Sequence, residues 1–342
     1  MKIKKQNSKG ITKKRIFISL LIIFGLVLSG VSYWFLSPVP RVYLINKAFE
    51  NRIENDVKPD NYEDDLKKVN LVKDINYNSK FPNGTLDIIS PKNTKETPVI
   101  FWVHGGGFIG GDKSQVTTYG VELAAHGYTV VSINYALAPK KIYPTPVLQL
   151  GEAYEFIKKN EIKYDLKLDN VYFAGDSAGA QISGQFINIQ TSPEYAKLTK
   201  IDAIVDPSTI KGVLLFCGPY SMPALANMEK TKAVKDFLST IGWAYMGKKN
   251  WEDLPETKVA SILNYVTKNY PPAFITDGNT TSFEDQGKAL ASALQSKGVP
   301  VESLFFDKNI AGEITHEYQF QMNTPAGEES FKKVLEFLVK NK

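Results

Sequence analysis

Short apolar segments alternate with longer amphipathic ones along residues 86–339, and this alternation restricts the fold more than any other feature of the chain. Several of the short segments, such as VIFWV and VLLF, are almost continuous apolar runs, as is typical of parallel strands covered on both faces. Strands that alternate with helices predict an α/β fold with a doubly wound, mostly parallel sheet. The expected strands are 86–90, 98–103, 128–134, 170–175, 212–217, 273–276 and 301–306, and the expected helices are 114–126, 146–160, 178–190, 283–296 and 328–339.

The first 36 residues have a different composition. Residues 1–15 carry seven Lys and Arg side chains and no acid, and residues 16–36 contain no charged residue. A helix over 16–36 would span about 30 Å, the thickness of the hydrocarbon core of a bilayer. Because basic flanks stay in the cytoplasm, we predict a cytoplasmic tail (1–15), a single transmembrane anchor (16–36) and an extracytoplasmic remainder at the cell membrane. The alternative is a cleaved signal peptide, although the segment ends in the bulky residues Tyr33, Trp34, Phe35 and Leu36 rather than in small ones.

Charge and cysteine content exclude some classes of function. The net charge of +5 falls to −2 when the seven basic residues of the tail are set aside, so the body of the protein offers no basic surface for nucleic acid. The single cysteine, Cys217, excludes an intrachain disulfide and follows an apolar run typical of a buried strand. The sequence indicates no metal site and no cofactor, and it does not predict an oligomeric state.

Two segments do not fit the alternation. Residues 37–80 are mixed and highly charged, and we expect a linker and an N-terminal cap segment with one or two short helices over 41–75, before a main domain at 81–342. Within that domain, residues 219–268 contain helical pieces but no clear strand. An insertion between two late strands would lie over the carboxyl edge of the sheet, where ligands bind in this architecture. We therefore predict a helical cap at about 219–268.

A candidate nucleophile follows the apolar strand at 170–175. Residues 175–179 read GDSAG, which is G-x-S-x-G between a strand and a helix. Such a turn is sharp, and its glycines leave room where a side chain two positions from the serine would clash. The turn exposes the serine hydroxyl beside the N-terminus of the next helix. The motif predicts Ser177 as a nucleophile.

A second glycine run ends the expected strand at 98–103. His104 is followed by Gly105, Gly106 and Gly107, and such a loop can point backbone N–H groups at a developing oxyanion. We expect two of these glycine N–H groups to act together with the N–H of Ala178. His104 itself is expected to hold the loop through its ring nitrogens.

The base and the acid follow from order along the chain. In enzymes with this kind of serine turn the order is Ser, acid, His, and of the three histidines only His316 follows Ser177. The first choice for the acid is Asp277, at the end of the strand expected at 273–276. Glu284 and Asp285 are alternatives, although acids are favoured anyway at the start of the helix expected there.

Three segments together resemble the hormone-sensitive-lipase-like branch of the α/β hydrolases: HGGGF at 104–108, NYALAP at 134–139 and GDSAG at 175–179. The resemblance covers about residues 85–340. It implies a carboxylesterase or lipase of the α/β-hydrolase fold that acts without a cofactor. In such an enzyme Ser177 would attack, His316 would relay the proton, and an acyl-enzyme would form and be hydrolysed.

The chain departs from this branch at three positions. Ala136 and Lys140 stand where the branch usually has Arg and Glu, and Thr281 stands where it has its catalytic acid. Either the loop is shortened and Asp277 serves, or another carboxylate does.

These features predict a membrane-tethered esterase for short- to medium-chain acyl esters. One alternative is a deacetylase of acetylated envelope sugars, because a tether holds an enzyme near the cell surface. Another is a non-catalytic surface module that keeps the fold for binding.

Overall fold

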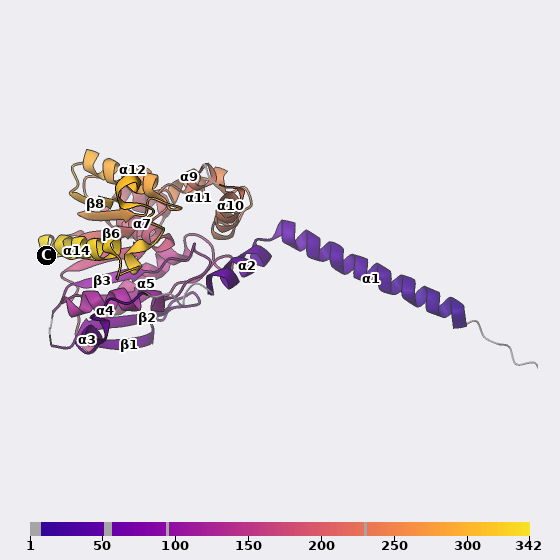
Figure 1. Ribbon diagram of the computed structural model, residues 1–342, viewed down its shortest axis with the longest axis horizontal. Coiled ribbons are helices and arrows are strands. Elements are labelled where there is room, and N and C mark those ends of the chain that lie inside the picture. The colour runs from indigo at the N-terminus through magenta and orange to yellow at the C-terminus, as the bar shows by residue number, and fades with distance from the viewer. Residues whose placement is uncertain (1–7, 51–56, 94–95, 229–230) are drawn as a thin grey trace, which may run out of the picture.

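The computed structural model describes residues 8–50, 57–93, 96–228 and 231–342. Its centre is one eight-stranded sheet with the strand order β1-β2-β4-β3-β5-β6-β7-β8 (Figure 1). Strand β2 is antiparallel to both of its neighbours, and the six strands from β4 to β8 in that order run parallel. The predicted mostly parallel α/β sheet is confirmed. The strands are β1 (Val69–Asn76), β2 (Thr85–Pro91), β3 (Val99–Val103), β4 (Thr129–Ile133), β5 (Val171–Asp176), β6 (Ile210–Phe216), β7 (Ala273–Asp277) and β8 (Val301–Phe305).

Helices cover both faces of this sheet. Alternate strand residues point to opposite faces, so that Ile100 and Trp102 pack with α4 (Thr117–Ala125) and α14 (Pro325–Lys340). Their neighbours Phe101 and Val103 pack on the other side, with α5 (Thr145–Lys159), α7 (Ala178–Thr191) and α12 (Glu284–Ser296). Burial on both faces explains the apolar runs in the sequence. Shorter helices are α3 (Tyr62–Leu66), α6 (Glu161–Tyr164), α8 (Pro193–Thr199) and α13 (Lys308–Ala311).

A group of helices covers the carboxyl edge of the sheet, and we call it the cap. It comprises α2 (Val39–Glu50) together with α9 (Met222–Ala226), α10 (Lys232–Met246) and α11 (Pro255–Val259), the last three of which lie between β6 and β7. The guanidinium of Arg41 on α2 lies 5.7 Å from the ring centre of Trp243 on α10. Asn46 on α2 donates from Nδ2 to the carbonyl of Ile109, 2.8 Å away, in the loop after β3. Helices close in space but distant in sequence thus form one cover (Figure 1).

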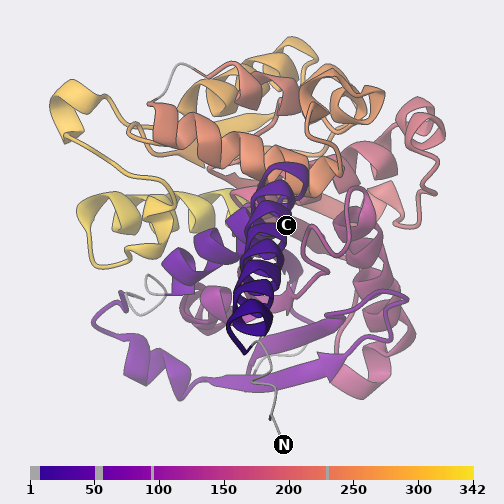
Figure 2. The ribbon, with the colours of Figure 1, turned by 90° about the vertical axis from the view of Figure 1, so that its right-hand side faces the viewer.

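Helix α1 (Ser8–Leu36) projects from the cap side of the domain, and Figure 2 shows it in front of the domain. Over Arg15–Leu36 it is long and apolar enough to cross a membrane, with a mean hydropathy of 2.4. Its large apolar side chains are exposed, so it is not a core helix of a soluble domain. Of the expected basic tail, residues 1–7 lie outside the described residues.

The boundary predicted at residue 81 is wrong. Strand β1 begins at Val69 and pairs antiparallel with β2 as an edge of the sheet, so residues 69–76 belong to the sheet and not to a cap segment. An edge strand has only a weak alternation: Val69 is buried, whereas Val72 is 46% exposed. A change of register between Val72 and Ile75 breaks the pattern further. The expected short helices are present as α2 and α3, and the part of this segment at 51–56 lies outside the described residues.

Candidate active site

Ser177 stands at the turn between β5 and α7 with a strained backbone, at φ 50° and ψ −117°. Two glycines make the turn possible. A Cβ on Gly179 would lie 1.9 Å from the carbonyl oxygen of Val103, and one on Gly175 would lie 2.4 Å from the backbone of Gly179. The serine hydroxyl therefore sits at the carboxyl edge of the sheet and beside the N-terminus of α7.

His316 reaches this hydroxyl from the loop before α14. Its Nε2 lies 3.0 Å from Ser177 Oγ. Phe283 meets the imidazole edge to face, with ring centres 5.4 Å apart. Burial lowers the pKa of His316, against the opposing effect of the Asp277 charge, so the imidazole is neutral at pH 7 and its Nε2 can accept the serine proton.

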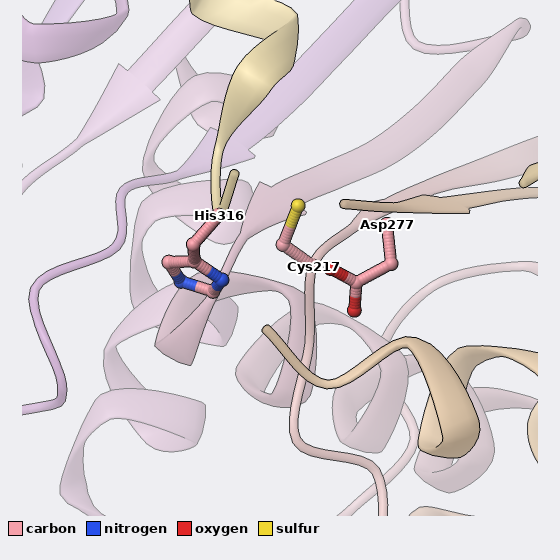
Figure 3. Close-up of side chains that lie close together, drawn as sticks. All are labelled: Cys217, Asp277 and His316. Atoms are coloured by element: carbon pink, nitrogen blue, oxygen red, sulfur yellow. The ribbon is translucent and has the colours of Figure 1, made fainter. Parts of the chain in front are cut away.

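Of the three candidate acids, Asp277 is the one that the structure brings near His316. It is the last residue of β7 and is fully buried. Its Oδ1 accepts a hydrogen bond from the hydroxyl of Ser282, and Ser282 Oγ lies 2.6 Å from His316 Nδ1. Figure 3 shows Asp277, Cys217 and His316 converging from three segments. Burial raises the pKa of Asp277 to about 6, although the positive form of His316 and the Ser282 hydroxyl act in the opposite direction.

The two alternative acids do not approach the imidazole. Glu284 and Asp285 begin α12, as expected of acids at a helix start. Glu284 forms an ion pair with Lys288, 2.8 Å away, and Asp285 is exposed. No sequence pattern pointed to Ser282, because a serine in a polar loop is common.

The glycine loop after β3 differs in one respect from expectation. The N–H of Gly105 donates to Oδ2 of Asp176 at 2.6 Å, so Gly105 is not free to bind an oxyanion, and its inclusion among the oxyanion donors is wrong. Gly106 and Gly107 have φ values of 106° and 60°, which only glycine adopts readily. Within the described residues no hydrogen bond takes up their N–H groups. These two donors and Ala178, the first residue of α7, remain candidates.

A buried polar group fixes this loop. Asp176 also accepts from Nε1 of Trp102, at 2.7 Å, so one carboxylate ties the serine turn to the neighbouring strand β3. His104 places Nδ1 2.7 Å from the carbonyl of Gly105 and stacks on Tyr135, with ring centres 4.4 Å apart. The structural role expected for His104 is confirmed, and burial lowers its pKa to about 4, so the ring is neutral. The fixing role of Asp176 was missed, although the residue lies inside the GDSAG motif.

A second carboxyl lies beside Asp176. Glu317 adopts a left-handed conformation, at φ 58°, and its Oε1 lies 3.8 Å from His316 Nε2. A Cβ on Gly105 would lie 2.4 Å from Asp176 Oδ2 and 2.5 Å from Glu317 Oε1, which shows how near the two carboxyls are. Burial and mutual repulsion raise the pKa of Asp176, and burial raises that of Glu317 to about 6. The two groups therefore share a proton more readily than isolated carboxyls do.

Cys217, Asp277 and His316 could in principle ligate a metal, because one ligand atom from each lies within 4.8 Å of the others. Both imidazole nitrogens are already engaged, Nε2 with Ser177 and Nδ1 with Ser282. Burial raises the pKa of the Cys217 thiol, so in the metal-free protein this thiol is protonated. The contacts of the two imidazole nitrogens fit proton transfer.

The segments that build this site match a known protein family. A profile of the BD-FAE family matches residues 86–294, more than half of the chain. The chain belongs to the BD-FAE family. The match in this BD-FAE member includes the glycine loop, Ser177 and Asp277, and it ends before His316.

The BD-FAE chain is also similar to esterases. An acetyl esterase of Salmonella typhi is 25% identical over 222 residues, which cover 64% of this chain and 65% of the relative. The chain thus spans somewhat less than two thirds of that relative's length.

Solved structures share its fold. Esterase B from Lactobacillus rhamnosis superposes with a TM-score of 0.74 at 20% identity, over 89% of this chain and 94% of the other. An esterase from the bacterial hormone-sensitive lipase family superposes with a TM-score of 0.65 at 19% identity, over 86% and 90% of the two chains. The expected α/β-hydrolase fold is confirmed.

Proposed function

We propose that this chain is a serine hydrolase of carboxylic esters that works through an acyl-enzyme. The observation that carries the proposal is the 3.0 Å contact between Ser177 Oγ and His316 Nε2, at a strained turn that holds the largely buried serine at the carboxyl edge of the sheet. A serine hydroxyl is a weak nucleophile by itself and needs a base within hydrogen-bond reach. The esterases among its relatives support the same chemistry.

The proposed reaction has two halves. Ser177 Oγ attacks the ester carbonyl and passes its proton to His316 Nε2, and the N–H groups of Gly106, Gly107 and Ala178 bind the oxyanion. His316 then gives the proton to the departing alcohol oxygen, which leaves an acyl-serine. A water molecule, deprotonated by the same imidazole, then attacks the acyl group. The bond between the acyl carbon and Ser177 Oγ breaks, His316 returns the proton to Ser177 Oγ, and the carboxylic acid is released. Asp277 stabilises the imidazolium in both halves.

Short- to medium-chain acyl esters are the proposed substrates. The cap packs directly on the glycine loop: Phe108 stacks on Tyr245 of α10 with ring centres 3.8 Å apart. A Cβ on Gly107 would lie 2.8 Å from Ile241 of the same helix. An apolar wall this close to the oxyanion donors favours small acyl groups. The acetyl esterase relative is consistent with this choice and with the deacetylation of envelope sugars as the second candidate.

We further propose that α1 is an uncleaved anchor with residues 37–342 outside the cytoplasmic membrane. The exposed apolar helix and the basic residues before it support this topology. Protease added to intact cells should digest the domain at residues 37–342 and leave cytoplasmic proteins whole. Protection of the domain in intact cells would contradict the topology, and a mature protein that begins after residue 29 would show a cleaved signal.

The activity is tested by hydrolysis of p-nitrophenyl acetate, butyrate and octanoate by the full chain in detergent micelles. Wild type should turn over at least one ester, and Ser177→Ala should lose about 10⁴-fold or more in kcat/KM. The control is Ser296→Ala, which removes an exposed serine and should keep full activity. Equal rates for wild type and Ser177→Ala would contradict the proposal. Inactivity of wild type on all three esters and on acetylated envelope polymer would favour the non-catalytic binding module.

A further inference from the structure

The carboxylate and the imidazole of the proposed triad do not form a hydrogen bond with each other. His316 Nδ1 lies 2.6 Å from Ser282 Oγ, and the same oxygen donates its hydrogen to Oδ1 of Asp277. A hydroxyl has one hydrogen to donate and lone pairs to accept with, so it can join a donor on one side to an acceptor on the other. Ser282 is buried, with 8% of its surface exposed, so bulk water does not screen this connection.

We propose that Ser282 is a positioning residue that transmits the charge of Asp277 to His316. This proposal rests on the proposed ester hydrolysis and deepens it. The chain Asp277–Ser282–His316–Ser177 replaces the direct contact of an aspartate with a histidine. The serine touches neither substrate nor the reacting atoms and acts only through the imidazole.

The proton inventory is consistent with this role. While His316 is neutral, its hydrogen is on Nδ1 and is donated to Ser282 Oγ, which leaves Nε2 free to accept from Ser177. When the proton of Ser177 arrives at Nε2, the imidazolium keeps its Nδ1–H bond to Ser282. Ser282 keeps its own hydrogen, directed at Asp277. No proton leaves Ser282, and the positive charge on the ring is offset by the carboxylate through one oriented hydroxyl.

Backbone contacts hold the loop of Ser282 against the loop of His316. Their two loops are joined by hydrogen bonds: Thr280 N donates to the carbonyl of Ile314 at 2.9 Å, and Ile314 N donates to Asn279 Oδ1 at 2.9 Å. The two loops are also closely packed, since a Cβ on Gly278 would lie 2.2 Å from the carbonyl oxygen of Thr315. These loop-to-loop contacts thus fix the backbone that carries Ser282 relative to the backbone that carries His316.

The same loop explains why a bridge is needed. Asp277 is the last residue of β7 and is fixed by the sheet. Thr281, the position to which the resemblance in sequence assigns the acid, is exposed and has a left-handed backbone, at φ 54°. A hydroxyl one residue further along, at Ser282, points inward and joins the strand-end carboxylate to the ring.

A double-mutant cycle on the full chain in micelles tests the relay, with p-nitrophenyl butyrate as substrate and thermal unfolding as a check of the fold. Ser282→Ala should lower kcat/KM by about 10²-fold, and Ser282→Thr, which keeps the hydroxyl, should stay within about tenfold of wild type. The matched control Thr281→Ala removes the neighbouring exposed hydroxyl and should have no effect. Because both residues act through one connection, Asp277→Asn with Ser282→Ala should be no worse than Asp277→Asn alone. Ser282→Ala as active as Thr281→Ala, or losses that multiply in the double variant, would overturn the proposal.

Relocating the carboxylate gives a sharper test. In the double variant Asp277→Asn with Ser282→Asp, the new carboxylate can accept directly from His316 Nδ1, and the amide introduced at the end of β7 can donate to it. We expect at least a tenfold gain in kcat/KM over Asp277→Asn alone. If Ser282 served only to pack the loop, moving the carboxylate to its position would not raise kcat/KM. A double variant that folds but is no more active than Asp277→Asn would therefore count against the proposal.

A measurement that needs no turnover separates this proposal from the proposed function. The ¹⁵N resonances of His316, assigned by their loss in His316→Gln, report its tautomer and its pKa. Ser282→Ala should lower the pKa of His316 and reduce the share of the Nδ1–H tautomer, whereas Thr281→Ala should change neither. If Ser177→Ala proves as active as wild type but these shifts occur, the hydrolase proposal fails and the connection stands. If the tautomer and pKa of His316 are unchanged in Ser282→Ala, the relay fails whatever the activity.

Discussion

The two halves of the candidate active site are built in different ways. In the nucleophile half, at residues 104–107 and 175–179, backbone conformation sets most of the geometry. The glycines allow backbone segments to pack so closely that any side chain would clash. A Cβ on Gly179, for example, would lie 1.9 Å from the carbonyl oxygen of Val103. In the acid–base half, at residues 277–283 and 314–317, side chains on two joined loops make the contacts. The carboxylate there reaches the imidazole through Ser282.

This difference decides what a sequence can reveal. A turn that tolerates only glycine leaves a motif, whereas a hydrogen-bond chain can be built with the carboxylate at more than one position of a loop. We therefore expect substitutions of the glycines in the nucleophile half to impair folding, and substitutions of the side chains in the acid–base half to impair catalysis. Four predictions test that contrast, from the largest expected effect to the smallest.

Replacement of the base should have the largest effect. His316→Gln keeps the size of the side chain but cannot accept the serine proton, and we expect kcat/KM to fall by about 10⁴-fold or more with little change in thermal stability. The matched control is His126→Gln, at an exposed histidine whose Nδ1 lies 2.7 Å from the carbonyl of Glu122. An equal loss of kcat/KM in both variants would indicate a general effect on folding, and the two halves of the site would then not differ as proposed.

Replacement of the acid should come next. Asp277→Asn should lower kcat/KM by about 10³-fold, because the imidazolium loses its compensating charge. Glu284→Gln and Asp285→Asn remove the alternative acids at the start of α12 and should stay near wild type. A larger loss in either of these than in Asp277→Asn would transfer the role of acid to α12.

The nucleophile half is best tested by its folding. Gly179→Ala places a Cβ against the carbonyl of Val103, and we expect a loss of at least about 3 kcal/mol in the free energy of unfolding. In Gly151→Ala, also within a helix, the nearest atom is the flexible Cδ1 of Ile204, 3.2 Å away, and stability should stay within about 1 kcal/mol of wild type. Denaturant unfolding of both variants measures the difference. If Gly179→Ala were stable but inactive, this glycine would be needed for catalysis rather than for folding, and the contrast would fail.

The pH profile should give the smallest effect. Burial raises the pKa of Asp277 to about 6, so below that pH the carboxyl is protonated and cannot offset the imidazolium. We expect kcat/KM to rise through about pH 6, with the value at pH 5 about tenfold below the plateau. The groups that influence this titration are His316, Cys217, Glu317, Tyr220 and Tyr318.

Asp277→Asn provides the check on that assignment. Loss of the negative charge lowers the pKa of His316 further, so the rising limb of the variant should lie at lower pH than that of wild type. A limb at the same pH in both proteins would contradict the link to Asp277.

The sequence predicted the parallel sheet because central strands buried on both faces are continuous apolar runs. It missed β1, an edge strand with polar residues and a change of register. It predicted Ser177 from its glycines and His316 from chain order, and it named Asp277 because that residue ends a strand. The engagement of Gly105 by Asp176 and the bridge at Ser282 depend on contacts between segments distant along the chain, which a local pattern does not encode.

The most direct test of the central claim is to trap the acyl-enzyme. The full chain, mixed with p-nitrophenyl butyrate and quenched with acid within the first turnover, is digested and examined by mass spectrometry. We predict the added mass of one butyryl group on the peptide that contains Ser177, and no such mass in Ser177→Ala. A butyryl group on Cys217 instead, or steady turnover with no acylated peptide at any time, would contradict the account.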